Sequence, residues 1–471
     1  MKKITGRSAF LSILQSEGVT HLFGNPGTTE LPIMHALKEY PDIKYILGLQ
    51  EAIVVAMADG YSRATGKLSA CNVHVAPGLG NAMGAIYNAK FVGSPIIITA
   101  GQQEQGHGLM EPMLYGPLVR MAEPLVKWAT EVNRLEDLPR IMRRAAKIAL
   151  SPPTGPVFIS LPGDILNKEA KIDLGKSTRV IDTYRPSHNS IELIAKKISK
   201  YKKPVIIAGH EVATSGAFKE ITMFAEYTGS AVYQQTVPHG SHYPSEHMAF
   251  MGTLPRLQKP TKNILENYDL LICVGCDGLR MSVWSDTEPL PSKMPIIHIG
   301  INEWEIGKNY STELAIIGNV KNTLNDINQY LKNTLTPEET LKAKKRLKLI
   351  AKNNWNVKKK SLTTKTMHDK LKKPITPNWL MMNIANNITK NNIVVEEGLV
   401  STRTLLNYLP YKNNKDFYGL ASGGIGWAVS GAIGVSLANP SKTIIAIIGD
   451  GSSMYGIQSL WSAAHYKLPI V

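Results

Sequence analysis

Short apolar runs alternate with longer amphipathic stretches along the first 185 residues. The runs read HLFG, KYILGL, SACNVHV, PIIITAG and PVFISLP, and helical spacing fills the intervals, most clearly over residues 51–64 and 80–89. Continuous apolar runs are typical of strands buried on both faces of a sheet. The alternation therefore predicts βαβ units and a parallel sheet covered by helices.

The same alternation returns twice further along the chain. A polar, proline-bearing stretch near 184–190 precedes PVIIAG, SAVYQQ, DLLICVG and PIIHIG, and IVVEEG, DFYGLA and TIIAIIGD follow from about residue 376. The pattern predicts three consecutive α/β domains with parallel sheets covered by helices, over 1–185, 190–331 and 376–471. The third is short for a domain, and Pro469-Ile470-Val471 resembles the start of another buried strand. We therefore expect it to be incomplete at its C-terminus.

The charge of the chain is concentrated in one segment. The formal net charge is +16, and residues 331–374 hold 14 Lys and Arg against 3 Asp and Glu, which is +11. Leu, Ile and Trp recur among these lysines at helical spacing, which is typical of a solvated helical linker. We interpret 332–375 as a basic linker. Because no groove of interleaved aromatic and basic residues accompanies it, we expect no nucleic-acid partner.

Cysteine usage and hydropathy bear on the compartment. Three cysteines cannot build a disulfide framework in so long a chain, which favours a reducing environment. Cys273 and Cys276 form a C-x-x-C at a strand end, and without a second ligand pair we interpret them as packing residues. No run of about 18 apolar residues occurs, and the N-terminus lacks the apolar core of a signal peptide. We expect a cytoplasmic protein outside the membrane.

Two glycine-rich turns could hold phosphate. Gly449-Asp450-Gly451 ends an apolar run and opens a helical stretch, so backbone N–H groups can face a phosphate while the Asp450 carboxylate holds Mg²⁺. Taken alone, such a triplet is also an ordinary strand-to-helix turn. The second turn, ASGGIGWAVSGAIG, permits either close helix packing or a close approach of backbone to a ligand. It is a poor dinucleotide fingerprint, because no acidic residue follows a strand about 20 residues on.

Glu51 is the other notable carboxylate. It joins the run KYILGLQ to the helical stretch AIVVAMADGYSRATGK. A Glu at this junction is commonly a first-turn charge favoured by the helix dipole. Its apolar neighbours Leu49, Ile53 and Val54 also suit a buried carboxyl that exchanges a proton with a heterocyclic nitrogen. Both interpretations remain open on the residues alone.

Five blocks in order along the chain resemble the thiamine-diphosphate-dependent decarboxylase and synthase superfamily, and its benzoylformate decarboxylase branch most of all. They are FGNPGTTELP, LQEAIVVAMADGYSRATGK, NVHVAPGLGNAMGAIYNA, ITAGQQ and IGDGSSMYGIQSLWSAAHY. The resemblance implies a pyrimidine-binding first domain, a structural central domain and a diphosphate-binding third domain. It also implies a homodimer or dimer of dimers, with each active site formed between the first domain of one subunit and the third domain of another.

The resemblance also assigns site residues. Glu51, His74 and Thr28 would be catalytic, with His74 handling protons and Thr28 touching the substrate carboxylate. Asp450 would bind Mg²⁺, and a paired asparagine that completes the family's metal site would fall about six residues beyond Val471. The implied cofactor-binding residues are Asn25, Pro26, Gly27, Glu51, Asn81, Gly423, Ile425, Gly449, Asp450, Gly451 and Ser452.

The implied reaction is non-oxidative decarboxylation of a small 2-oxo acid, with thiamine diphosphate and Mg²⁺ as cofactors and no FAD. An acetolactate-synthase-like carboligase is the alternative within the family. A non-catalytic protein that retains the fold is the alternative from another class. A second active-site histidine of the decarboxylase branch has no counterpart, because Ser282 stands at its place. An aromatic pocket residue of that branch is likewise replaced near Gly419. His107 could stand in for that histidine, although it reads as an exposed loop residue.

Overall fold

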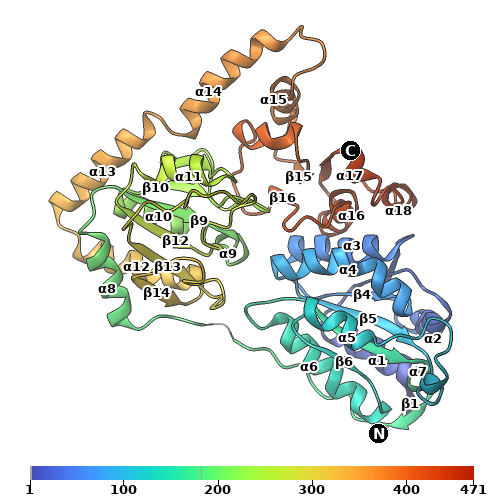
Figure 1. The fold of residues 1–471 in the computed structure, drawn as a ribbon. Coiled ribbons are helices and arrows are strands. Elements are labelled where there is room, and N and C mark those ends of the chain that lie inside the picture. The colour runs from blue at the N-terminus through green and yellow to red at the C-terminus, as the bar shows by residue number, and fades with distance from the viewer. Residues whose placement is uncertain (1–2, 182) are drawn as a thin grey trace. The chain divides into compact units, whose positions relative to one another are not determined.

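The computed structural model describes residues 3–181 and 183–471 and divides the chain into two compact units (Figure 1). One unit contains the chain up to Ile181 together with Asn391–Glu397 and Leu420–Val471. The other contains Asp182–Lys390 and Gly398–Gly419. Parallel sheets covered by helices occur in both units, which confirms the predicted fold class.

The first unit is built on a six-stranded sheet in the order β3-β2-β4-β5-β7-β6, with every neighbouring pair parallel. The predicted apolar runs form its five longest strands, whereas β6 was not predicted. The strands are β2 (His21–Gly24), β3 (Lys44–Leu47), β4 (Ser69–Val73), β5 (Ile96–Gln102), β6 (Ala129–Glu131) and β7 (Val157–Pro162). A separate antiparallel pair joins β1 (Lys3–Thr5) to β8 (Glu169–Lys171).

Helices bury both faces of this sheet. One hydrophobic core lies under α1 (Gly6–Ser16), α2 (Leu31–Ala36) and α6 (Leu138–Leu150). The other lies under α3 (Glu51–Thr65), α4 (Val75–Val92) and α5 (Leu118–Ala122). Strands β4, β5 and β7 are buried along their whole length, as expected of a parallel sheet covered on both sides. Helix α7 (Gly163–Asn167) follows β7.

Local sequence sets the ends of the two helices that matter most for the site. The Gln50 side chain accepts hydrogen bonds from the N–H groups of Ala52 and Ile53 and so caps α3, and Gly66 ends it in the left-handed conformation with φ +70°. Helix α4 begins directly after His74 and ends at Gly93, with φ +74°. It is therefore longer at both ends than the predicted 80–89.

The C-terminal part of this unit contains the parallel pair β15 (Asn392–Glu397) and β17 (Thr443–Ile448). Helix α16 (Trp427–Ala438) packs on α3 at backbone contact. A Cβ on Gly434 would lie 2.0 Å from the Met57 carbonyl oxygen, and one on Gly60 would lie 2.2 Å from the Gly431 carbonyl oxygen. Glycine is therefore required where the two helices cross.

The stretch after Asp450 differs from the prediction of one helix. It forms α17 (Asp450–Ser453) and α18 (Ser459–His465), separated by turns. The break falls where Gly456 lies against the glycine loop before α16, since a Cβ there would lie 2.7 Å from the Gly426 carbonyl oxygen. Residues Pro469 and Val471 pair with β17 through hydrogen bonds to Ile444 and Ala446.

The second unit has a six-stranded parallel sheet in the order β11-β10-β9-β12-β13-β14. Chain order thus reverses direction between β9 and β12, as in doubly wound folds. The strands are β9 (Pro204–Ala208), β10 (Ala231–Gln234), β11 (Phe250–Thr253), β12 (Leu270–Val274), β13 (Ile296–Gly300) and β14 (Leu314–Ile317). Its helices are α8 (His188–Ile198), α9 (His210–Thr214), α10 (Phe218–Thr228), α11 (Gln258–Leu265) and α12 (Val320–Thr334).

The basic segment forms two helices, α13 (Pro337–Ala351) and α14 (Trp355–Thr366). A capping box between Thr336 and Glu339 starts α13. Leu347 and Trp355 are buried in the hydrophobic core of the second unit. The segment is therefore packed against that unit as well as exposed to solvent. Helix α15 (Pro377–Asn387) and strand β16 (Phe417–Gly419) complete the unit. Within 3–181 and 183–471, no helix is long and apolar enough to cross a membrane.

Candidate functional site

Glu51 lies in the first turn of α3 and is 6% exposed. Its Oε1 accepts a hydrogen bond from Asn25 Nδ2 over 3.2 Å, and its Oε2 accepts one from Asn81 Nδ2 over 3.0 Å. Gly78 lies against it, since a Cβ there would be 3.0 Å from Oε1. Asn25, Glu51 and Asn81, all expected from the sequence, thus form one hydrogen-bonded group, contributed by the loop between β2 and the short helix η1 (Thr28–Glu30), by α3 and by α4.

His74 pairs with a carboxylate that sequence reasoning missed. Its Nδ1 lies 2.7 Å from Glu30 Oε2. The Glu30 side chain is fully buried, and it also accepts hydrogen bonds from the N–H groups of Gly27 and Gly101, each over 2.9 Å. A carboxylate fixed by two backbone donors holds the proton of the neutral imidazole on Nδ1. The Nε2 atom of His74 is then the one that remains for chemistry.

Two glycines lie directly against the His74–Glu30 pair. A Cβ on Gly27 would lie 2.2 Å from His74 Nδ1, and one on Gly101 would lie 2.2 Å from Glu30 Oε1. Both positions therefore exclude larger residues. Glu30 is the third residue of the short helix η1 (Thr28–Glu30), and its carboxylate accepts the Gly27 N–H in a capping-box arrangement. That spacing is the sequence signal that could have identified Glu30.

The backbone after His74 is strained. Val75 has φ +46°, a left-handed conformation that is rare for a β-branched residue. Such outliers persist only where the surrounding structure holds them, and they concentrate at functional sites. Val75 is fully buried and starts α4, whose first full turn is closed by the hydrogen bond from Gly78 N to His74 O, over 2.8 Å. The strain fixes the direction in which His74 leaves the sheet.

Pro26 lies in the connection between β2 and η1, and Thr28 is the first residue of η1. Thr28 is exposed and Pro26 is partly exposed. The Thr28 hydroxyl thus lies on the loop that carries Asn25 toward Glu51 and Glu30 toward His74. The six residues Asn25–Glu30 therefore link the two hydrogen-bonded groups.

The second predicted region is the glycine loop before α16. Gly423 has φ +99° and Gly426 has φ +89°, and a side chain on Gly423 would meet open space. Ile425 is partly exposed. The Glu397 carboxylate, at the end of β15, accepts hydrogen bonds from Gly426 N over 2.6 Å and Ala428 N over 2.7 Å. Burial raises the pKa of Glu397 to about 7, against the opposing effect of these backbone donors.

The third predicted region follows β17. Asp450 is exposed at the start of α17, with Gly449 as the N-cap. A side chain on Gly451 would meet open space, and Ser452 is partly exposed. The open backbone beside an exposed carboxylate leaves room for a phosphate and a Mg²⁺ ion, which binds one or two carboxylates together with phosphate oxygens. In the described parts of the chain no group of three or more His, Cys, Asp or Glu could hold a metal alone.

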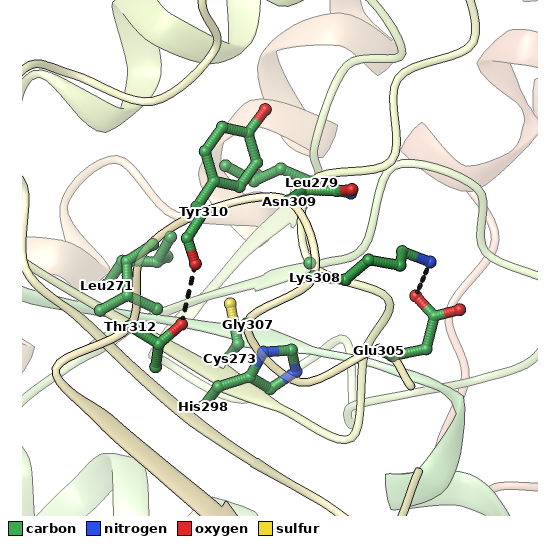
Figure 2. A pocket seen from close by; sticks show the side chains of 12 residues that line it. Leu271, Cys273, Leu279, His298, Glu305, Gly307, Lys308, Asn309, Tyr310 and Thr312 are labelled. Carbon is green, nitrogen blue, oxygen red and sulfur yellow. Dashed lines mark hydrogen bonds and ion pairs between the residues drawn. The ribbon is translucent and has the colours of Figure 1, made fainter. Parts of the chain in front are cut away.

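The second unit has a hollow on one face of its sheet, lined by residues of β12 and β13 and by the segment 305–312. Figure 2 shows Cys273, His298, Glu305, Lys308 and Tyr310 around it. Lys308 Nζ is paired with Glu305 over 2.6 Å, and burial lowers the pKa of His298. The hollow contains none of the predicted site residues. His107, the possible substitute histidine, is exposed in η3 (Gln105–Met110) of the other unit.

Comparisons with known proteins identify the family of this chain. Models of the thiamine pyrophosphate enzyme family match in three consecutive segments: the N-terminal TPP-binding domain at residues 4–113, the central domain at 191–327 and the C-terminal TPP-binding domain at 400–471. The chain belongs to the thiamine pyrophosphate (thiamine diphosphate) enzyme family.

Individual relatives fall in two groups. The chain is 30% identical to benzoylformate decarboxylase from Pseudomonas aeruginosa, over 99% of this chain and 85% of that protein. It is 28% identical to the acetolactate synthase large subunit of Buchnera aphidicola, over 100% of this chain and 82% of that protein. The crystal structure of benzoylformate decarboxylase from Polynucleobacter necessarius superimposes with a TM-score of 0.86 at 28% identity, over 99% of this chain and 84% of that one.

Proposed function

We propose that the protein is a thiamine-diphosphate-dependent decarboxylase that releases CO₂ from a small 2-oxo acid and yields an aldehyde, similar to benzoylformate decarboxylase. The observation that carries the proposal is the His74–Glu30 pair, held at 2.7 Å beside the loop that brings Asn25 to Glu51. A decarboxylase must return a proton to the carbon that loses CO₂. An imidazole oriented by a buried carboxylate is suited to that transfer.

Three groups of residues would hold the cofactor. Glu51, with Asn25 and Asn81, would face the aminopyrimidine ring, together with Pro26 and Gly27. Gly423 and Ile425 would face the middle of the cofactor, between its aminopyrimidine ring and its diphosphate. Gly449, Gly451 and Ser452 would hold the diphosphate, with Asp450 as a Mg²⁺ ligand. When bound, thiamine diphosphate would supply a nucleophilic ring carbon and a positively charged ring that can take up the electron pair left by CO₂.

The chain's own residues would move the protons. Glu51 is held by two amide donors, so its carboxyl group has a fixed orientation and can exchange a proton with a ring nitrogen placed against it. His74 Nε2 would take up a proton from solvent and pass it to the carbon that has lost CO₂. The Thr28 hydroxyl, exposed on the same connection, would donate a hydrogen bond to the substrate carboxylate.

A carboligase similar to acetolactate synthase is the second candidate, favoured by the relatives of that name. Such an enzyme joins the decarboxylated fragment to a second ketone rather than to a proton. A non-catalytic protein that retains the fold is the third candidate. Against it, Glu51, His74 and Gly449-Asp450-Gly451 all stand, in order, at the places that the resemblance gives to catalysis and cofactor binding.

The proposed enzyme uses no flavin. In doubly wound sheets, ligands bind outside the carboxyl ends of the strands where the order reverses, here β9 and β12. Glu211, which follows β9, lies buried at this edge of the sheet. Glu211 N donates to Gly275 O over 3.0 Å, and the Glu211 carboxylate accepts a hydrogen bond from Ile301 N over 2.8 Å. A buried carboxylate at this position would repel the phosphates of a dinucleotide.

A second copy of this chain would complete the active site, as a homodimer or a dimer of dimers. Large apolar side chains are exposed around the two cofactor regions of the first unit. Met454 and Tyr455 are 66% and 65% exposed, and Leu460 is 56% exposed. Leu49, next to Glu51, is 42% exposed. Exposed apolar patches of this kind mark protein–protein contacts. We place the enzyme in the cytoplasm, where free thiols such as buried Cys71 persist.

The test is turnover by the protein expressed from its gene with whatever coding sequence follows codon 471. Benzoylformate and pyruvate are supplied with thiamine diphosphate and Mg²⁺, and CO₂ and organic products are measured for the wild type and Glu51→Gln. Aldehyde with an equal amount of CO₂, both lost in Glu51→Gln, would support the decarboxylase. A condensed 2-hydroxy-2-alkyl-3-oxo acid would instead establish the carboligase, and absence of cofactor binding would favour the non-catalytic protein.

A further inference from the structure

Asn88 makes an unusual set of contacts with the glycine loop. This side chain, on the C-terminal half of α4, is 2% exposed. Its Nδ2 donates to the Gly424 carbonyl oxygen over 2.7 Å, and its Oδ1 accepts the Gly424 N–H over 3.2 Å. Its Oδ1 also accepts the Ser422 hydroxyl. One amide therefore satisfies both backbone groups of Gly424, as a neighbouring strand would, and these partners fix the orientation of the amide.

The loop is fitted closely to α4 at this point. A Cβ on Gly424 would lie 2.5 Å from the Gly84 carbonyl oxygen and 2.7 Å from Asn88 Nδ2. The loop therefore touches the backbone of α4 one turn before Asn88. Two residues later, Gly426 is held from the other side by the Glu397 carboxylate. Ile425 is the residue between these two anchors, so its backbone has little freedom to move.

We infer that Asn88 is a positioning residue, which holds the Gly423–Gly426 loop in its cofactor-binding shape before the cofactor arrives. The inference rests on the proposed function, in which this loop faces thiamine diphosphate. Left-handed glycines at 423 and 426 give the loop many conformations in the absence of restraints. Asn88 removes that freedom in advance, and a preformed site binds more tightly because less ordering is required on binding.

The same helix serves both predicted regions. Asn81 lies seven residues before Asn88, two helical turns away, and donates to Glu51. Helix α4 therefore carries one amide that orients the proposed catalytic carboxylate and a second that orients the glycine loop. Among the residues that the structure describes, the hydrogen bonds of the Asn88 side chain go to Gly424 and Ser422, not to Glu51 or His74. Its loss should therefore act on cofactor affinity and leave the catalytic groups in place.

The experiment compares Asn88→Ala with Asn328→Ala. Asn328, in the second unit, is a matched control, because it is 3% exposed and its Nδ2 donates to the Glu220 carbonyl oxygen over 2.8 Å. Thiamine diphosphate affinity is measured by calorimetry at saturating Mg²⁺, and the unfolding midpoint is measured alongside. Both variants should lose stability, and only Asn88→Ala should bind the cofactor roughly tenfold more weakly. Equal affinity in Asn88→Ala and the wild type would overturn the inference while leaving the proposed function intact.

Amide hydrogen exchange tests the inference without cofactor. In the wild-type apoprotein the Gly424 amide should exchange slowly, because Asn88 Oδ1 accepts its proton. Asn88→Asp keeps this acceptor and loses the donor to the Gly424 carbonyl, so protection at Gly424 should persist while cofactor affinity falls. Fast exchange at Gly424 in the wild type would overturn the inference. Slow exchange in a protein that fails to bind thiamine diphosphate would reject the proposed function alone.

Discussion

The indole of Trp427 donates a hydrogen bond to the carboxylate of Asp59 over 2.7 Å, and both side chains are buried. Trp427 is the first residue of α16, two residues after Ile425, and Asp59 lies two turns after Glu51 on α3. The Arg63 guanidinium stacks on the same indole, 4.5 Å from the ring. The two predicted cofactor regions of the chain thus share a buried polar link.

Trp427→Phe should lower the free energy of unfolding by about 1–3 kcal/mol, since it leaves a buried carboxylate short of a donor. Burial raises the pKa of Asp59, and Arg63, Ser94 and the Trp427 indole oppose this effect. Removing the indole donor raises that pKa further. The loss of unfolding free energy in Trp427→Phe should therefore grow as pH rises, because the charged form of Asp59 is the one that needs the indole donor. Urea unfolding followed by circular dichroism at pH 5 and pH 8 measures both effects.

Trp304→Phe is the control for this prediction. Trp304 is 74% exposed, so its replacement should leave the midpoint unchanged at both pH values. An equal midpoint for Trp427→Phe and the wild type would mean that the link contributes nothing to the stability of α16 on α3.

Glu397 should make stability decline as pH rises. Its folded-state pKa of about 7 lies above the ordinary value of 4.5, because burial disfavours the charged form. The folded protein therefore retains this proton between pH 4.5 and 7 when the unfolded chain has lost it. The resulting stabilisation is fully present below pH 4.5 and is lost as pH rises through 7, by roughly 3 kcal/mol in all.

Glu397→Gln removes this titration. The difference in unfolding free energy between wild type and variant should fall with increasing pH and level off above pH 7. Urea titrations at several pH values between 4.5 and 8 measure it, with Glu266→Gln, at an exposed position, as the comparison. If the unfolding free energies of the wild type and Glu397→Gln change in parallel with pH, Glu397 does not have the raised pKa that this prediction requires.

Apolar patterning predicted most of the fold because the strands of a covered parallel sheet are continuous apolar runs. The run PIIITAG became β5 and TIIAIIGD became β17. The edge strand β6 was missed because ATE is short, mostly polar and half-buried. The break between α17 and α18 could not be predicted from spacing, since it depends on Gly456 meeting Gly426 from a distant segment.

The candidate site was partly predictable for a related reason. The order of motifs pointed to Asn25, Glu51, Asn81 and His74, and the structure joins the first three by hydrogen bonds. Glu30 was missed because two of its partners, His74 and Gly101, are distant in sequence, and a carboxylate within GTTELP resembles an ordinary surface residue. Only the fold brings Gly101 and His74 to it. Asn88 was missed likewise, because the loop that it holds begins 334 residues later at Ser422.

Glu30→Gln should reduce kcat by roughly 100-fold or more while leaving thiamine diphosphate affinity unchanged. An amide in place of the carboxylate can present an N–H to His74 Nδ1, which moves the imidazole proton to Nε2 and removes the proton acceptor there. Steady-state decarboxylation and cofactor titration measure the two quantities. Glu39→Gln, at an exposed position, is the control, and unchanged kcat in Glu30→Gln would exclude His74 from proton transfer.

Glycine-to-alanine changes at two helical positions should have opposite signs. Gly434→Ala places a Cβ 2.0 Å from the Met57 carbonyl oxygen, so α16 must move away from α3, and overpacking of this kind costs about 1–3 kcal/mol. Gly84→Ala, in α4, meets open space and should stabilise the protein by about 0.5–1 kcal/mol through helix propensity. Urea unfolding of both variants measures the signs. Because α16 begins at the glycine loop, Gly434→Ala should also weaken cofactor binding, whereas a stable Gly434→Ala with wild-type affinity would show that the helix crossing tolerates separation.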